Sequence, residues 1–272
     1  MFRIGHKLSR SVHRKFSGDS SVDVSESDGI RYLHLGSDTV QSAMRVKDPT
    51  ALELRYSRGV MLFLLFYPQA ASMLSLGLGG GSIAKYVYRY LPHMRQRVVE
   101  IDPQVIRIAR SHFELPEDDE RLQVIEADGA GYIAQHPESA DVLLLDAFGS
   151  HGLPEVLSSQ TFFDQCAAAL TVEGVLIANL WGSDKRFDVY LQCLEQSFGN
   201  RVLVLATGRP GNILVFGFKQ IPDDLRWSSL RERAKALEAE HRIEFLEFVE
   251  ALRDRNPCSN HRLFMGTPEE QR

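Results

Sequence analysis

Seven short apolar runs follow one another from residue 71 onward, separated by stretches with helical character. Runs of this length predict buried strands, and their alternation with helices is typical of a doubly wound, mainly parallel sheet with helices on both faces. The last two runs lie close enough in the chain to pair as an antiparallel edge. The sequence therefore predicts an α/β domain with a seven-stranded sheet over residues 69–220. The runs are SMLSLGL, RQRVVEI, RLQVIEA, DVLLLDA, GVLIANLW, RVLVLAT and ILVFGFK.

Two further segments precede this domain. Residues 1–28 are basic at first and then rich in serine and aspartate, so we expect them to form a mobile arm. Within residues 29–68, apolar and polar residues alternate in 30–36 and 39–46, which predicts a small β-hairpin able to cover one side of a site. The sequence DPT then predicts the start of a buried helix over 48–67.

Residues 221–272 form a C-terminal extension in which apolar residues recur at helical spacing among many charged ones. The pattern predicts a long helix. Two uses for this helix stay open, which are packing against the domain and formation of a dimer.

The composition narrows the class of function. Of the 272 residues, 44% are hydrophobic and 25% are charged, and the net charge of -5 supplies no basic field that would steer the chain onto nucleic acid. The longest apolar run, Val60 to Tyr67, is far shorter than the roughly 20 residues of a membrane-spanning helix. Three dispersed cysteines and scattered histidines predict neither disulfides nor a structural metal site. We therefore expect a soluble cytoplasmic protein without a metal, a membrane anchor or a nucleic-acid partner.

A glycine-rich loop is the first candidate for a ligand site. Residues 77–82 read GLGGGS, between a predicted strand and a predicted helix. Glycine lets the backbone turn sharply and approach a ligand, and the helix N-terminus presents free N–H groups. Gly77, Gly79 and Gly80 are therefore candidate nucleoside-binding residues, although a tight strand-to-helix turn also needs glycine.

Three carboxylates follow at the carboxyl ends of successive predicted strands, where open α/β sheets bind ligands. Glu100 stands after the second strand, where an acidic side chain can accept hydrogen bonds from ribose hydroxyls. Asp128 is either an adenine ligand or the N-cap of the next helix, and Asp146 is a candidate base. Asp102, by contrast, is predicted to cap the helix that begins at Pro103.

In their order and spacing, the motifs LGLGGG, VVEIDP, EADG and LLLDAFG resemble the spermidine synthase (polyamine aminopropyltransferase) family, over about Gly29 to Lys219. The resemblance implies a Rossmann-like sheet of the kind found in S-adenosylmethionine-dependent methyltransferases. It also implies that Glu100 holds the ribose, Asp128 reads the adenine and Asp146 acts as the base.

The resemblance further implies the reaction and two more site residues. In this family a primary amine attacks the methylene carbon beside a sulfonium, and methylthioadenosine leaves. The co-substrate is decarboxylated S-adenosylmethionine and the acceptor is a small-molecule amine. Family members are commonly dimers or tetramers, and we expect a homodimer. By the same resemblance, Gln41 in the hairpin binds the nucleoside and Tyr56 in the following helix binds substrate.

Four positions depart from the family pattern. Gly80 stands where the family motif GGGDGG has an aspartate for the aminopropyl ammonium, and Gly149 stands where DSSDP has a second aspartate. Ser57 replaces a histidine or glutamine, and Arg209 replaces an aromatic residue. These changes weaken the complementarity to a cationic polyamine. One hypothesis is that the donor is intact S-adenosylmethionine, which would transfer an aminocarboxypropyl group and pair its carboxylate with Arg209. The alternative is a solvated loop arginine.

Three other functions stay open. The same sheet and nucleoside contacts serve small-molecule methyltransferases, because fold alone does not fix function. The missing carboxylates are also compatible with a non-catalytic nucleoside-binding protein. A nicotinamide-dependent dehydrogenase is the weakest option, since GLGGGS lacks the GxGxxG register.

Overall fold

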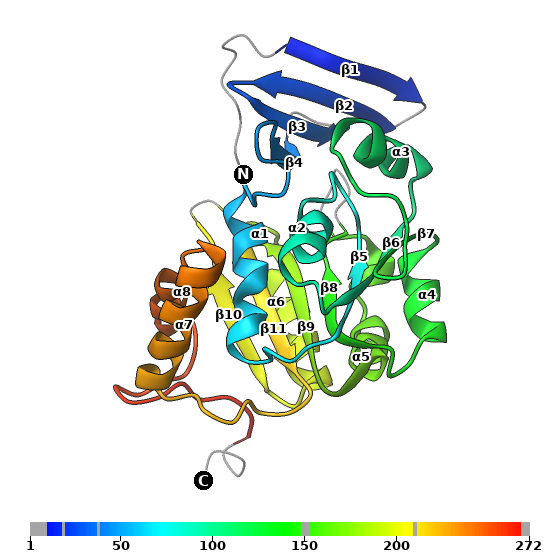
Figure 1. Ribbon diagram of the computed structural model, residues 1–272. Coiled ribbons are helices and arrows are strands. Elements are labelled where there is room, and N and C mark those ends of the chain that lie inside the picture. The colour runs from blue at the N-terminus through cyan, green and yellow to red at the C-terminus, as the bar shows by residue number, and fades with distance from the viewer. Residues whose placement is uncertain (1–9, 18–19, 37–38, 148–152, 209–210, 268–272) are drawn as a thin grey trace.

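The computed structural model of the chain describes residues 10–17, 20–36, 39–147, 153–208 and 211–267 (Figure 1). It shows a small antiparallel sheet above a larger unit in which helices cover both faces of a second sheet. The predicted α/β fold with a seven-stranded, mainly parallel sheet is confirmed.

Each strand of the large sheet lies on one of the seven apolar runs. The strands are β5 (Ser72–Leu76), β6 (Arg95–Glu100), β7 (Leu122–Glu126), β8 (Ala140–Leu145), β9 (Leu170–Trp181), β10 (Val202–Ala206) and β11 (Asn212–Phe218). Their order is β10-β11-β9-β8-β5-β6-β7. The five strands from β9 to β7 pair in parallel, whereas β11 is antiparallel to both of its neighbours, so the predicted antiparallel edge is confirmed.

Helices cover both faces because side chains along each strand alternate between two cores. The helices are α1 (Arg55–Val60), the 3-10 helix η1 (Met61–Leu65), α2 (Ser82–Tyr90), α3 (Pro103–His112), α4 (Gly129–Gln135), η2 (Glu155–Leu157), α5 (Gln160–Ala169), α6 (Phe187–Ser197), α7 (Trp227–His241), α8 (Phe245–Ala251) and η3 (Leu252–Asp254). Along β8, Val142 and Leu144 face the core covered by α1, α2, α7 and α8. Leu143 and Leu145 face the core covered by α4, α5 and α6.

The small sheet contains the predicted hairpin and two further strands. Its strands are β1 (Arg10–Ser17), β2 (Ser20–Ser27), β3 (Ile30–Leu35) and β4 (Val40–Arg45), paired in that order. The structure differs here from the expected mobile arm over residues 1–28, because 20–27 pair with the hairpin. Val22 and Val24 drive this pairing, since they alternate with polar residues and are buried against Ile108 and Phe113 at the C-terminal end of α3.

Two helix predictions are corrected by the structure. The predicted start at residues 48–50 is a turn, in which the Thr50 hydroxyl donates to the Asp48 carboxylate, and α1 begins only at Arg55. The long C-terminal helix is two helices, because Arg242 adopts a left-handed conformation with φ of 55° and ends α7. Within the described residues, none of the helices is both long and apolar enough to cross a membrane.

Asp141 lies at the start of β8, at the amino-terminal edge of the parallel strands, and links neighbouring strands there through its carboxylate. Its Oδ2 accepts hydrogen bonds from the backbone N–H groups of Ala71 and Ser72 and from the Ser72 hydroxyl. Its Oδ1 accepts from the Thr171 hydroxyl at 2.8 Å. Burial raises the pKa of this carboxyl, but the hydrogen bonds outweigh it and hold the pKa below its usual value. One side chain thus joins the starts of β5, β8 and β9.

Candidate active site

A cavity of about 280 Å³ lies at the carboxyl ends of β5, β6, β7 and β8, partly covered by β3 and β4 of the small sheet. This is the edge at which open α/β sheets bind ligands. Arg209 lies outside the described residues. The residues predicted from the sequence that line the cavity are Gln41, Tyr56, Gly77, Gly79, Glu100, Asp128 and Asp146.

The glycine loop is packed too closely to carry a side chain at Gly77 or Gly80. Gly77 has φ of +96°, and a Cβ there would overlap the backbone carbonyl of Asp146. A Cβ on Gly80 would lie 2.8 Å from both Ser42 Oγ and Phe113 Cδ1. Gly80 was predicted to bind the nucleoside, but it is not among the residues that line the cavity. The position of the family aspartate is therefore closed by β4 and the end of α3.

Replacing Gly77 tests this close packing. We expect Gly77→Ala to lower the free energy of unfolding by about 2 kcal/mol more than Gly29→Ala does, because only the former adds a steric overlap to the left-handed strain. Gly29 is the matched control, since it has φ of +75° but nothing within 4 Å of an added Cβ. Urea unfolding of both variants measures the difference, and equal costs would contradict the predicted overlap.

Glu100, at the end of β6, holds the glycine loop in place. Its Oε2 accepts a hydrogen bond from Leu78 N at 2.9 Å, and its Oε1 accepts one from Asp102 N at 2.9 Å. Burial raises the pKa of this carboxyl, and the two backbone N–H groups partly offset that effect. Each carboxylate oxygen retains acceptor capacity for a ligand hydroxyl.

Both aspartates at helix starts cap their helices. Asp102 accepts from Gln104 N, and Pro103 is the first residue of α3, which confirms the predicted cap. Asp128 accepts from Gly131 N through its Oδ2 at 2.7 Å and also lines the cavity. The two interpretations of Asp128 are therefore compatible, because the cap uses one oxygen and the side chain still faces the ligand space.

Asp146, just after β8, is a buried carboxyl held from two sides. Its Oδ1 accepts from Asn179 Nδ2 at 2.7 Å, and its Oδ2 accepts from the Tyr56 hydroxyl at 3.2 Å. Burial raises the pKa of Asp146 to about 6, although both hydrogen bonds act in the opposite direction. Asn179 in turn accepts from Asn212 Nδ2 at 2.9 Å. A carboxyl in this setting is ionised at neutral pH and can accept a proton.

The sequence prediction missed Asn179. The signal was present, because Asn179 is a polar residue within the apolar run GVLIANLW. A polar side chain buried in a central strand needs a partner, and here it has one in Asp146. The sequence analysis predicted that Tyr56 binds substrate, and it did not predict the hydrogen bond that the Tyr56 hydroxyl donates to Asp146 in the structure.

Two apolar side chains and Gln41 indicate what kind of ligand the cavity suits. Ile101 and Val156 are apolar, line the cavity and are 67% and 59% exposed. Gln41 also lines the cavity, and its side-chain Nε2 is buried with no hydrogen-bond partner within the described part of the chain. Exposed apolar surface and a buried unpaired donor in one cavity both indicate a ligand that is partly apolar and can accept a hydrogen bond.

Comparison with known proteins gives consistent results. Residues 54–191 match the model of the spermine/spermidine synthase domain. The chain is 40% identical to a polyamine aminopropyltransferase from Chromobacterium violaceum, over 92% of this chain and 96% of that protein. It is 41% identical to a protein of the same name from Neisseria meningitidis serogroup B, over 89% and 92% of the two chains. The fold matches that of a probable spermidine synthase from Corynebacterium glutamicum, with a TM-score of 0.71 at 20% identity, over 86% and 88% of the two chains.

Proposed function

Because the chain belongs to the spermine/spermidine synthase family, we propose that it is an aminopropyltransferase, which moves the aminopropyl group of decarboxylated S-adenosylmethionine to a small-molecule amine. The observation that carries this proposal is the buried carboxyl of Asp146, held by Tyr56 and Asn179 in the wall of a cavity at the carboxyl edge of the sheet.

The nucleoside half of the donor fits the part of the cavity nearest β6 and β7. Glu100 supplies two carboxylate oxygens for the ribose hydroxyls, and its backbone bonds fix their direction. Asp128 has one oxygen outside its helix cap for the adenine amino group. Ile101 and Val156 offer apolar contact to the purine ring, and Gln41 offers a donor.

The chemistry follows from the position of Asp146. The acceptor nitrogen forms a bond to the propyl carbon next to the sulfonium, the carbon–sulfur bond breaks, and methylthioadenosine leaves with the electron pair. A primary amine has a pKa near 10.4, so its nitrogen must lose a proton during this step. Asp146, ionised above about pH 6, accepts that proton. The sulfonium is already an activated leaving group, so positioning supplies much of the rate.

Gly80 bears on the choice of donor, because the loop offers no carboxylate to the end of the transferred arm. We propose the decarboxylated donor on the strength of the family, with intact S-adenosylmethionine and methyl transfer as the competing possibilities. The acceptor we propose is a polyamine precursor. We also propose that the protein acts as a homodimer, as the resemblance implies, and that it is cytoplasmic, a location that its three dispersed cysteines favour.

Substitution of Asp128 tests the nucleoside site. We expect Asp128→Ser to weaken binding of methylthioadenosine by roughly tenfold, since serine retains the helix cap but is too short to reach the adenine. Asp128→Ala should weaken binding similarly and also lower the thermal midpoint, because alanine cannot cap α4. Isothermal calorimetry and thermal unfolding separate the two effects. Unchanged affinity in both variants would show that Asp128 is only a cap.

A further inference from the structure

Tyr56 reaches Asp146 from α1, a short helix that lies between the sheet and the two C-terminal helices (Figure 1). On its sheet side α1 is tightly seated, because a Cβ on Gly59 would lie 3.0 Å from Leu214 Cδ1 and 3.1 Å from Thr207 Cγ2. On its other side, two ion pairs join α1 to the C-terminal helices.

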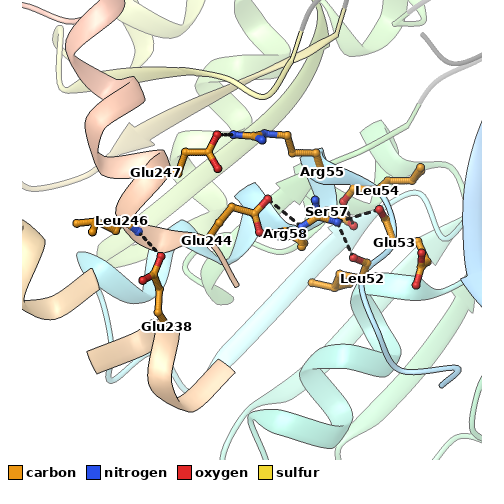
Figure 2. A network of polar contacts seen from close by, with 10 residues as sticks. All are labelled: Leu52, Glu53, Leu54, Arg55, Ser57, Arg58, Glu238, Glu244, Leu246 and Glu247. Atoms are coloured by element: carbon orange, nitrogen blue, oxygen red, sulfur yellow. Dashed lines mark hydrogen bonds and ion pairs between the residues drawn. The ribbon is translucent and has the colours of Figure 1, made fainter. Parts of the chain in front are cut away.

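The guanidinium of Arg58 on α1 forms hydrogen bonds both to the segment before α1 and to the start of α8. Figure 2 shows Arg58 directed toward Glu244, the residue that precedes α8. The Arg58 Nε lies 3.0 and 2.9 Å from the two carboxylate oxygens of Glu244. Its Nη1 donates to the carbonyl oxygens of Leu52 and Glu53 at 2.9 and 2.8 Å. The side chains of Arg58 and Glu244 are each 26% exposed, so solvent screens this pair less than a surface pair.

A second ion pair joins the same helices at the surface. Arg55 Nη2 lies 2.6 Å from Glu247 Oε1, and the Glu247 side chain is 60% exposed. Among the described residues, neither side chain of this pair has a hydrogen bond to the segment before α1. It is therefore a natural control for the inner pair, because it has the same chemistry and joins the same elements.

We propose that Arg58 and Glu244 are positioning residues for aminopropyl transfer, which fix α1 so that the Tyr56 hydroxyl meets Asp146. The inference rests on the proposed function. Tyr56 lies between Arg55 and Arg58 on a helix of only six residues, so a small displacement of α1 moves its hydroxyl out of hydrogen-bond range of the carboxylate. The C-terminal extension thus acts on the active site through α1.

A displacement of α1 can be measured through the pKa of Asp146, because Tyr56 on α1 is one of the groups that face this carboxyl. Tyr56 faces the carboxyl from α1 and Asn179 faces it from β9, and within the described residues these two are its hydrogen-bond partners. The Tyr56 hydroxyl stabilises the ionised carboxylate. Loss of that hydrogen bond therefore raises the pKa of Asp146 and moves the acid limb of the pH–rate profile to higher pH.

The test compares Arg58→Gln and Glu244→Gln with Tyr56→Phe and with the control Glu247→Gln. We expect the two inner variants to lower kcat by roughly 2- to 30-fold and to move the acid limb in the same direction as Tyr56→Phe. Glu247→Gln should leave both quantities unchanged. In the Tyr56→Phe background, Glu244→Gln should add no further shift of the acid limb, because the hydrogen bond it supports is already absent.

The pKa of Asp146 in protein labelled with 13C-aspartate, assigned with Asp146→Asn, gives a readout that needs no substrate. A higher pKa in Glu244→Gln than in Glu247→Gln supports positioning even where the proposed reaction is wrong. An unchanged pKa and acid limb in folded Arg58→Gln and Glu244→Gln would overturn the proposal. A shift that persists in full in the Tyr56→Phe background would also overturn it, since the pair would then act by another route.

Discussion

Asp146→Asn is expected to lower kcat by roughly 10²- to 10⁴-fold, the range of a lost general base. The substitution keeps the shape of the side chain and most of its bonds. The new amide oxygen still accepts from Asn179, and its NH₂ group can donate to the Tyr56 hydroxyl, which reverses its role. The variant should therefore fold normally and bind methylthioadenosine with wild-type affinity, because only the acceptor for the amine proton is lost.

The wild-type enzyme gives an independent check on Asp146. A base with a pKa of about 6 is ionised above that value, so activity should fall as the pH drops through about 6. The acid limb should be missing from the residual activity of Asp146→Asn. Steady-state rates between pH 5 and 9 measure both. An Asn variant with more than about one tenth of wild-type kcat would exclude Asp146 as the base.

Asp141→Ala is expected to lower the free energy of unfolding by about 3 kcal/mol, because it leaves the part-buried Ser72 N–H and Thr171 hydroxyl without their acceptor. The loss should depend on pH. The pKa of Asp141 is depressed in the folded state, so its contribution to stability is present above the unfolded pKa and is lost as the pH falls through the lower, folded value.

Asp119→Ala is the matched control for this prediction. Asp119 also accepts from two backbone N–H groups, those of Arg121 and Leu122, but it is exposed and water can replace it. Urea unfolding at pH 7 should show a much larger loss for Asp141→Ala than for Asp119→Ala. Similar losses would mean that the lower exposure of Asp141 does not make its hydrogen bonds contribute more to stability than those of Asp119.

Local signals in the sequence were sufficient to predict the large sheet and the carboxylates of the cavity wall. The apolar runs have strand length, and the carboxylates Glu100, Asp128 and Asp146 stand at the end of a strand or within two residues after it. Because parallel strands share one carboxyl edge, residues that follow different strands meet there without any knowledge of the strand order. Asn179 was missed because its bond to Asp146 depends on β8 and β9 being neighbours.

Features that depend on distant parts of the chain could not be predicted in this way. Residues 20–27 are mostly polar, and only the cover provided by α3 makes two valines sufficient to hold β2 in a sheet. The left-handed residue that divides the C-terminal helices is an arginine, which carries no local sign of a break. The contact between Arg58 and Glu244 joins residues 186 positions apart, and no periodic pattern reports such a pair.

The most direct test of aminopropyl transfer is analysis of the products by liquid chromatography and mass spectrometry. The enzyme is incubated with a panel of amines and either decarboxylated or intact S-adenosylmethionine, with Asp146→Asn as the control. We predict methylthioadenosine and an amine heavier by one aminopropyl group, in equal amounts, from the decarboxylated donor, with roughly 10²- to 10⁴-fold slower formation by Asp146→Asn. Formation of S-adenosylhomocysteine from the intact donor, with no methylthioadenosine from the decarboxylated one, would contradict it and identify a methyltransferase.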